Sequence, residues 1–202
     1  MTDHFAALDE PRRPWLDAEE LKEKFHSLST SVHPDRVHGA DEATRRAASD
    51  QYTALNAAFQ CLREPKSRLQ HLLLLERGSK PGDLKSIPED VVQLFAEVGA
   101  VLRQTDALLK EKAQAISPMV KVRVLEKSLP SLDKISQLQS ILAQRREALL
   151  SELRALDEAW QQRPHDSAGD SLLADAERLY HLFGFLDRWV AQLQERMVQL
   201  TL

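Results

Sequence analysis

The triplet His33-Pro34-Asp35 is the first group of residues in the chain whose types and spacing suggest chemistry. Proline fixes its own backbone angle, supplies no amide proton and disfavours the helical conformation in the residue before it, so the triplet must lie in a loop. An exposed carboxylate such as that of Asp35 can accept two parallel hydrogen bonds from a partner's arginine. This chemistry is recognition of another protein, and we expect the chain not to be an enzyme.

Two amphipathic helices are predicted to position this loop. Asp17 is placed to cap the first helix, with Glu20 completing a capping box, and apolar residues then recur on one face as far as Val32. Asp41 can cap the second helix, which is expected to end near Pro65. The sequence therefore predicts a helical hairpin that displays the triplet in its connecting loop.

The second half of the chain has the periodicity of three long helices. The first is predicted over about residues 88–116, and a short stretch over 120–129 then leads to Pro130, where a break is expected. A second helix follows as far as Arg163, and a third places apolar residues at alternating steps of four and three over 172–200. Such helices bury their apolar stripes against one another as an antiparallel bundle, with self-association as a coiled coil as the alternative.

The densest cluster of helix-breaking residues, at 78–83, lies between these halves. We therefore divide the chain into an N-terminal domain over 1–78, a linker over 79–87 and a C-terminal domain over 88–202. With 6 Gly, 2 Tyr and 6 Phe, the composition is poor in the residues of sheets and tight turns. The predicted fold class is all-α, an N-terminal helical hairpin followed by a three-helix antiparallel bundle.

Overall composition excludes several classes of function. A net charge of −4 argues against a nucleic-acid binder. The longest apolar run, residues 72–75, is far too short to cross a bilayer, and the first residues lack the features of a secretory signal. A single cysteine, Cys61, excludes a disulfide framework and fits a reducing compartment. We expect a cytoplasmic protein that binds neither membranes nor nucleic acid.

No metal or cofactor is predicted. His26, His33, His38 and His71 lack the spacing of metal ligands, and Cys61 is interpreted as a small core residue. The sequence also has no glycine-rich loop of the type that holds phosphates.

The hairpin with its triplet, together with residues 56–68, closely resembles a J-domain. In J-domains the triplet lies between helices two and three, and the third helix ends with an Asn-x-Ala-aromatic-x-x-Leu pattern before a proline. The resemblance implies that the loop and nearby basic residues bind the nucleotide-binding domain of a DnaK-type chaperone and stimulate its ATP hydrolysis. The residues concerned are His33, Pro34, Asp35, Lys22, Lys24 and Arg36.

The helix before the triplet departs from the J-domain pattern. His26, Ser27 and Ser31 stand where many J-domains have lysine or arginine. Because steering by charge mainly raises the association rate, we expect a weaker or more selective contact with the chaperone. A solvated helix face balanced by neighbouring glutamates is the alternative interpretation of Lys22 and Lys24.

Residues 56–73 and 185–188 are similar to the HscB family, which pairs an N-terminal J-domain with a C-terminal three-helix domain. HscB proteins deliver an iron–sulfur cluster scaffold protein to a dedicated DnaK-type chaperone, HscA in many bacteria. The resemblance thus implies a co-chaperone with a DnaK/HscA-type chaperone and an iron–sulfur scaffold as partners. A helical adaptor or self-associating coiled-coil protein with a degenerate J-domain is the alternative.

By the same resemblance Val92, Glu97 and Phe185 fall on positions that contact the scaffold. Four neighbouring positions, where Met, Leu and two Glu are usual, hold Gln93, Ala96, Ala100 and Gln104. Most of the acidic face is therefore missing, which leaves a different client open. Burial in the bundle core is the alternative interpretation of Val92 and Phe185.

Overall fold

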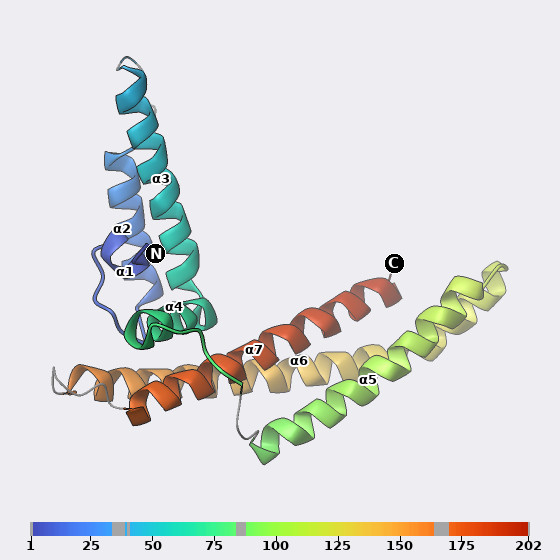
Figure 1. Cartoon of the computed structure of the whole chain (residues 1–202). Helices are drawn as coiled ribbons and strands as arrows, with labels where there is room; N and C mark the ends of the chain where they lie inside the picture. Colours follow the sequence, from blue (N-terminus) through green and yellow to red (C-terminus); the bar gives the residue numbers. More distant parts are fainter. Residues whose placement is uncertain (1, 34–38, 40, 84–87, 164–169, 202) are drawn as a thin grey trace. The chain divides into compact units, whose positions relative to one another are not determined.

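The computed structural model describes residues 2–33, 39, 41–83, 88–163 and 170–201 (Figure 1). This part of the chain contains seven α-helices and no strand, which confirms the all-α fold class. The helices are α1 (His4–Ala7), α2 (Ala18–Ser31), α3 (Glu42–Arg63), α4 (Pro65–Arg77), α5 (Glu89–Gln114), α6 (Pro118–Gln161) and α7 (Asp170–Thr201).

The chain forms two compact units. The first combines Met1–Gly82 with Ser151–His181, and the second combines Asp83–Leu150 with Leu182–Leu202. Helices α6 and α7 therefore contribute one segment to each unit. The domain boundaries expected from the sequence stay predictions, and part of the expected linker, residues 84–87, lies outside the described residues.

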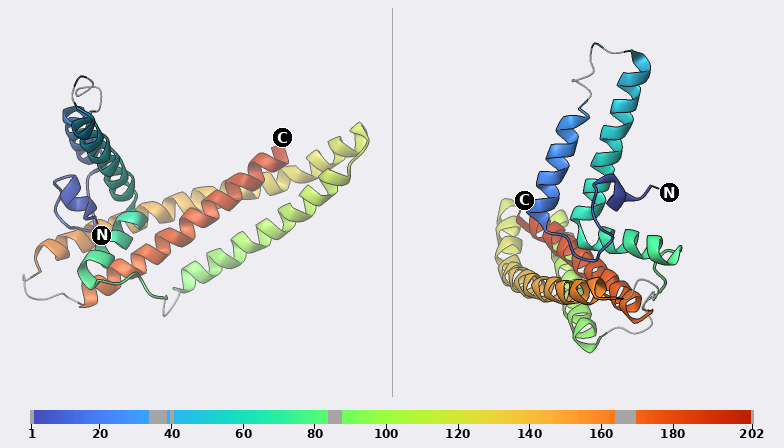
Figure 2. Two further views of the ribbon diagram at one scale, coloured as in Figure 1. Left: turned by 45° about the horizontal axis from the view of Figure 1, so that its top comes forward. Right: turned by 90° about the vertical axis from the view of Figure 1, so that its left-hand side faces the viewer.

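The predicted hairpin in the first unit is formed by α2 and α3, which lie side by side in both views of Figure 2. The side chain of Asp17 accepts hydrogen bonds from the first amides of α2, and Asp41 caps α3 through the amide of Thr44. Such caps satisfy backbone donors that have no partner inside the helix. The rings of Phe25 and Phe59 stack between the two helices with their centroids 4.4 Å apart.

Helix α3 is the centre of this unit, because it contacts α1, α2 and α4. Helix α4 begins with Pro65 in its first turn and ends at Gly78, which adopts the left-handed conformation at φ 71. The side chains that α1 and α4 add to the core are fully buried. They are Phe5, Leu69, Leu72 and Leu73.

A buried guanidinium holds the segment before α2 against the end of α3. Arg68 is only 3% exposed, and it donates to the carbonyl oxygens of Pro14 at 2.7 Å and Leu62 at 2.6 Å. Burial lowers the pKa of Arg68 to about 10. The buried guanidinium is tolerated because it donates hydrogen bonds to two carbonyl oxygens, which in turn would lack a donor without it.

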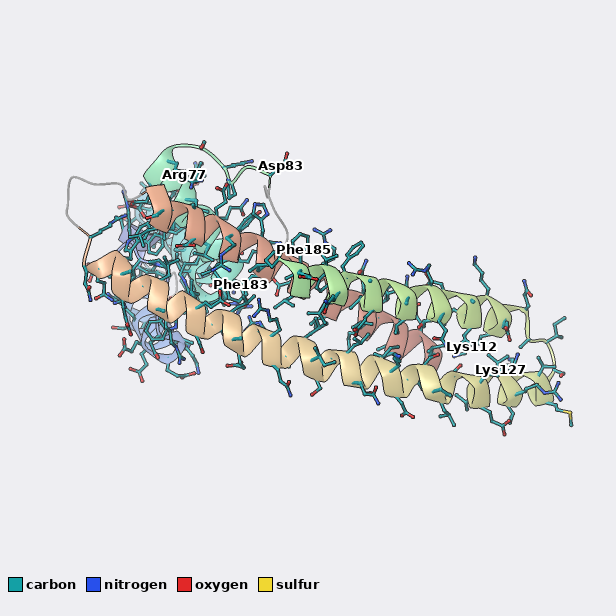
Figure 3. The ribbon with its side chains drawn as sticks, turned by 90° about the horizontal axis from the view of Figure 1, so that it is seen from below. Arg77, Asp83, Lys112, Lys127, Phe183 and Phe185 are labelled. Carbon is teal, nitrogen blue, oxygen red and sulfur yellow. The ribbon has the colours of Figure 1, made fainter. Side chains whose placement is uncertain are left out.

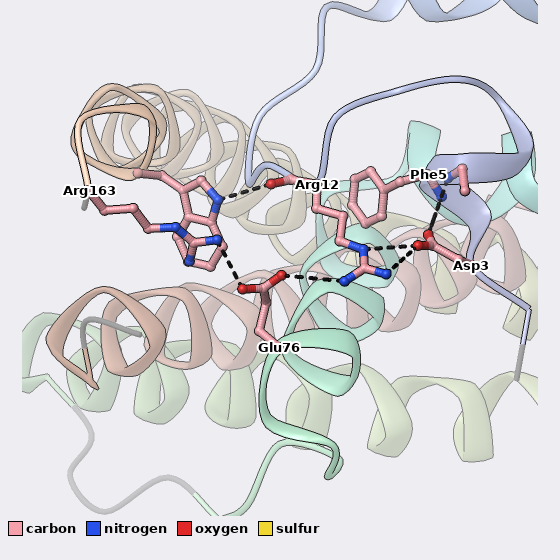
Figure 4. A network of polar contacts seen from close by, with 7 residues as sticks. Asp3, Phe5, Arg12, Glu76 and Arg163 are labelled. Carbon is pink, nitrogen blue, oxygen red and sulfur yellow. Dashed lines mark hydrogen bonds and ion pairs between the residues drawn. The ribbon is translucent and has the colours of Figure 1, made fainter. Parts of the chain in front are cut away.

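Ion pairs also join the N-terminal segment to α4 and to the end of α6 within this unit (Figure 4). Arg12 binds Asp3 at 2.7 Å, and Glu76 accepts from Arg163 at 2.9 Å. The indole of Trp160 donates to the carbonyl of Arg12 at 3.0 Å. Residues from the N-terminus and from the end of α6 thus complete the first unit.

The second unit is the predicted three-helix bundle (Figure 3). It is built from α5, residues 118–150 of α6 and residues 182–201 of α7. The predicted stripe of α5 is buried at Val91, Val98 and Val101, and Ile135 and Leu142 are buried on α6. Along the third helix Val190 of the predicted stripe is 40% exposed, whereas the neighbouring Trp189 is 4% exposed. Lys112, which ends the stripe of α5, donates to the last carbonyls of α7.

The prediction of a helix break at Pro130 is wrong, because α6 continues through this residue without interruption. A proline inside a helix leaves the carbonyl of residue i−4, here Glu126, without its amide donor. Both residues are exposed, so water can supply the missing hydrogen bond. On the other side of the helix the buried positions continue past the proline in helical register, at Val124, Ser128 and Ser131. Packing of these positions therefore overrides the preference of proline to end a helix.

Candidate functional site

The triplet predicted to bind the chaperone is described only at His33. Pro34, Asp35 and Arg36 lie outside the described residues. His33 follows the end of α2, is half-buried, and packs edge-on against Tyr52 of α3 with ring centroids 5.3 Å apart. The hairpin therefore holds the first member of the triplet against its second helix.

The two predicted basic residues of α2 have different surroundings. Lys22 is exposed, and its ammonium lies 3.3 Å from the carboxylate of Glu19. Lys24 donates to the carbonyl of Asp9 and lies 3.1 Å from the carboxylate of Glu10. Although burial opposes the charge, these acidic neighbours raise the pKa of Lys24. Lys22 thus presents its charge to solvent, whereas Lys24 ties α2 to the turn after α1.

An apolar groove on the second unit brings together two of the three residues predicted to bind a client. Val92 of α5 and Phe185 of α7 line it together with Val91, Phe95 and Trp189, and it encloses about 210 Å³. Figure 3 shows Phe185 beside the beginning of α5. The groove therefore lies where the N-terminal part of α5 meets α7.

The groove has an exposed wall and a buried floor. Val92 is 48% exposed and Phe95 64% exposed, whereas Phe185 is half-buried. The ring of Trp189 is buried beneath them, stacked on Phe185 at 5.9 Å and tilted towards Phe95 at 6.3 Å between centroids. Large apolar side chains gathered on a surface in this way are typical of sites for other proteins.

Glu97, the third predicted client residue, is exposed but does not line the groove. It follows Val92 by five residues, which turns its side chain about 140° around the helix. The exposed positions between them on this face are neutral, at Gln93 and Ala96. Glu97 is therefore a charge beside the groove and not part of its lining.

Phe95 and Trp189 are groove residues that the sequence analysis missed. Phe95 is the single aromatic residue of α5 and lies off the buried stripe that contains Val91 and Val98. A large aromatic side chain outside the apolar stripe of a helix is a signal for a binding surface, and it could have identified Phe95. Trp189 gave no such signal, because it lies beside the apolar stripe of α7, where a large apolar side chain is expected to pack in the core.

No helix in the described ranges combines the length and the apolar character that a membrane span requires.

Solved structures of other proteins are similar to this structure over almost the whole chain. No family model matches the sequence. The structure of the chaperone HscB from Vibrio cholerae superposes with a TM-score of 0.58 and 20% identity, over 98% of this chain and 99% of that chain. Human co-chaperone protein HscB superposes with a TM-score of 0.57 and 18% identity, over 98% of this chain and 81% of that chain. The chain therefore has the fold of the HscB chaperones, a helical J-domain followed by a C-terminal helical bundle.

Proposed function

We propose that the protein is a co-chaperone that stimulates the ATPase of a DnaK/HscA-type chaperone and delivers a client protein to it. The observation that supports this proposal is the HscB fold over 98% of the chain, together with the occurrence of the triplet in the sequence between α2 and α3. The two compared proteins are named as a chaperone and a co-chaperone. The chemistry is binding between proteins, with ATP hydrolysis performed by the partner.

The chaperone contact is proposed to depend mainly on Asp35. Its carboxylate accepts a paired hydrogen bond from an arginine of the chaperone, while Pro34 stiffens the loop and His33 fixes its start against α3. Lys22 and Arg36 add positive charge that steers association. Lys24 is already engaged by Glu10, so its contribution is stabilisation of α2 within its unit.

The client contact is proposed to be the groove of Val92, Phe95, Phe185 and Trp189. An apolar side chain of the client fills it, and the exposed Phe95 and the half-buried Phe185 anchor the contact as aromatic residues do at interfaces. An iron–sulfur scaffold protein is the proposed client, following the similarity to HscB. Because the side chains that line the groove are apolar, the contact rests on apolar burial and little on charge.

A steady-state ATPase assay with the DnaK-type chaperones of the same organism tests this function. Catalytic amounts of the protein are expected to raise the rate of ATP hydrolysis, and Asp35→Asn is expected to abolish the increase with helicity unchanged. Asp50→Asn, the same change on an exposed position of α3, is the matched control and keeps full stimulation. Equal stimulation by Asp35→Asn and wild type contradicts the proposal and favours a helical adaptor.

A further inference from the structure

Three helices of the first unit bring His4, Cys61 and His71 together, although these residues are 57 and 10 positions apart in the sequence. His4 belongs to α1, Cys61 to α3 and His71 to α4. One potential ligand atom from each lies within 4.8 Å of the other two. The two imidazole rings are 4.5 Å apart between centroids. The cluster is therefore created by the packing of the three helices and is not encoded by a local sequence motif.

These side chains are the ligand types that zinc prefers. A thiolate binds Zn²⁺ at about 2.3 Å and an imidazole nitrogen at about 2.0 Å, so tetrahedral donors lie roughly 3.5 Å from one another. The three donors lie within 4.8 Å of one another, so metal binding requires them to approach by about 1 Å. One thiolate with two imidazoles excludes Mg²⁺ and Ca²⁺, which prefer oxygen ligands.

A second observation is that one nitrogen of this cluster is buried without a partner. His4 Nδ1 is excluded from solvent and forms no hydrogen bond, a costly state for a polar atom in a folded protein. His71 Nε2 accepts a hydrogen bond from the amide of His4 at 3.0 Å, so a metal ion bound through this nitrogen would replace that amide.

The charges around the cluster are compatible with a bound cation. Burial raises the pKa of the Cys61 thiol, while the guanidinium of Arg68 opposes that rise. A metal ion displaces the thiol proton, and the resulting thiolate offsets part of the repulsion between the metal and Arg68. The carboxylate of Asp3 adds negative charge beside both imidazoles, although it also binds Arg12.

We propose that His4, Cys61 and His71 form a binding site for a thiol-seeking divalent transition-metal ion such as Zn²⁺, with a fourth position open to water or to a side chain of another protein. A metal bound here links α1, α3 and α4 and so stabilises the folded first unit. The proposal differs from the sequence-based expectation of no metal, because that expectation compared histidine spacings along the chain. It is independent of the proposed co-chaperone function.

Titration of the full chain with Co²⁺ under reducing conditions tests the site. Cys61 is the single cysteine among 202 residues, so a thiolate-to-cobalt absorption band reports this site alone. One equivalent of Co²⁺ is expected to develop the band, and one equivalent of Zn²⁺ to remove it. Zn²⁺ is also expected to raise the melting temperature and to slow alkylation of Cys61.

Variants separate ligation from other effects of the metal. Cys61→Ser is expected to abolish the cobalt band and the rise in melting temperature, and His4→Ala to weaken Zn²⁺ binding at least roughly tenfold. His26→Ala, which removes an exposed histidine of α2, is the matched control and leaves both unchanged. The proposal is overturned if no thiolate band develops, or if Zn²⁺ binds Cys61→Ser and His4→Ala as tightly as it binds wild type.

Discussion

The guanidinium of Arg13 donates hydrogen bonds to both carboxylate oxygens of Asp157, although 144 residues separate the two in the chain. The carboxylate is 2% exposed, and it also accepts from the amide of Trp15 and from the side chain of Gln161. The hydrogen bond to Asp157 raises the pKa of Arg13. The end of α6 is therefore an integral part of the first unit.

Asp157→Asn is expected to lower the free energy of unfolding by about 2–4 kcal/mol. Removing one partner of a buried ion pair leaves the other charge and its hydrogen-bond donors uncompensated. Urea denaturation followed by tryptophan fluorescence measures the change, since Trp15 and Trp160 both lie in this unit. Glu158→Gln, at an exposed neighbouring position, is the control. If both variants unfold at the same urea concentration, the ion pair contributes little.

Arg68→Met is expected to destabilise the first unit by about 1–3 kcal/mol. The change keeps the apolar volume and removes a buried charge, but it leaves the carbonyls of Pro14 and Leu62 without their donors. Thermal unfolding followed by circular dichroism gives the melting temperature. Arg46→Met, an exposed arginine of α3, should melt as wild type does. An Arg68→Met protein that is as stable as wild type would show that water replaces both hydrogen bonds.

Phe95→Ala is expected to weaken client binding with little effect on stability. The ring is 64% exposed, so its removal should change the free energy of unfolding by about 0.5 kcal/mol or less. As an interface anchor it should contribute on the order of 2 kcal/mol to binding. Calorimetric titration with an iron–sulfur scaffold protein from the same organism measures the affinity. Ile116→Ala, which truncates a side chain 96% exposed elsewhere on the unit, is the control.

Phe185→Ala is expected to lower both stability and client affinity, because the ring is half-buried and also lines the groove. Loss of melting temperature with unchanged affinity would mean that Phe185 is a core residue alone. The affinity of wild type should change little between low and high salt, since the side chains that line the groove are apolar. A steep salt dependence would contradict the assignment of the groove.

Glu177 is expected to make the first unit less stable in acid. The hydrogen bond from Arg77 and that from the amide of Gly82 hold its pKa below the ordinary value of 4.5, although burial opposes them. The carboxylate therefore contributes stability that is fully present above pH 4.5 and is lost as the pH falls through the lower folded-state pKa. Melting temperatures of wild type and Glu177→Gln should differ at pH 7, and the difference should shrink as the pH falls below 4.5. A difference independent of pH would assign the effect to packing.

The helices could be predicted because their signals are local. Asp17 and Asp41 precede the apolar faces that they cap, and the repeat of Ile135 and Leu142 marks the buried side of α6. Pro130 shows the limit of local rules, since the loss of one hydrogen bond on an exposed face is a smaller effect than burial of the stripe on the opposite face.

The candidate sites depend more on contacts that sequence spacing does not encode. Val92 and Phe185 could be paired through resemblance, but the exposure of Phe95 follows from how α5 and α7 pack. The approach of His4 to Cys61 arises from the packing of α1 on α3, and no periodicity along either helix indicates it.

The shared use of α6 and α7 by both units has a consequence for synthesis of the protein. Because Ser151–His181 completes the same unit as Met1–Gly82, that unit cannot finish folding until residue 181 has left the ribosome. At roughly 5–20 residues per second, the intervening stretch of about 100 residues takes about 5–20 s to translate. During this time the nascent N-terminal helices lack Asp157 and Trp160, and Arg13 and the Arg12 carbonyl must stay hydrated.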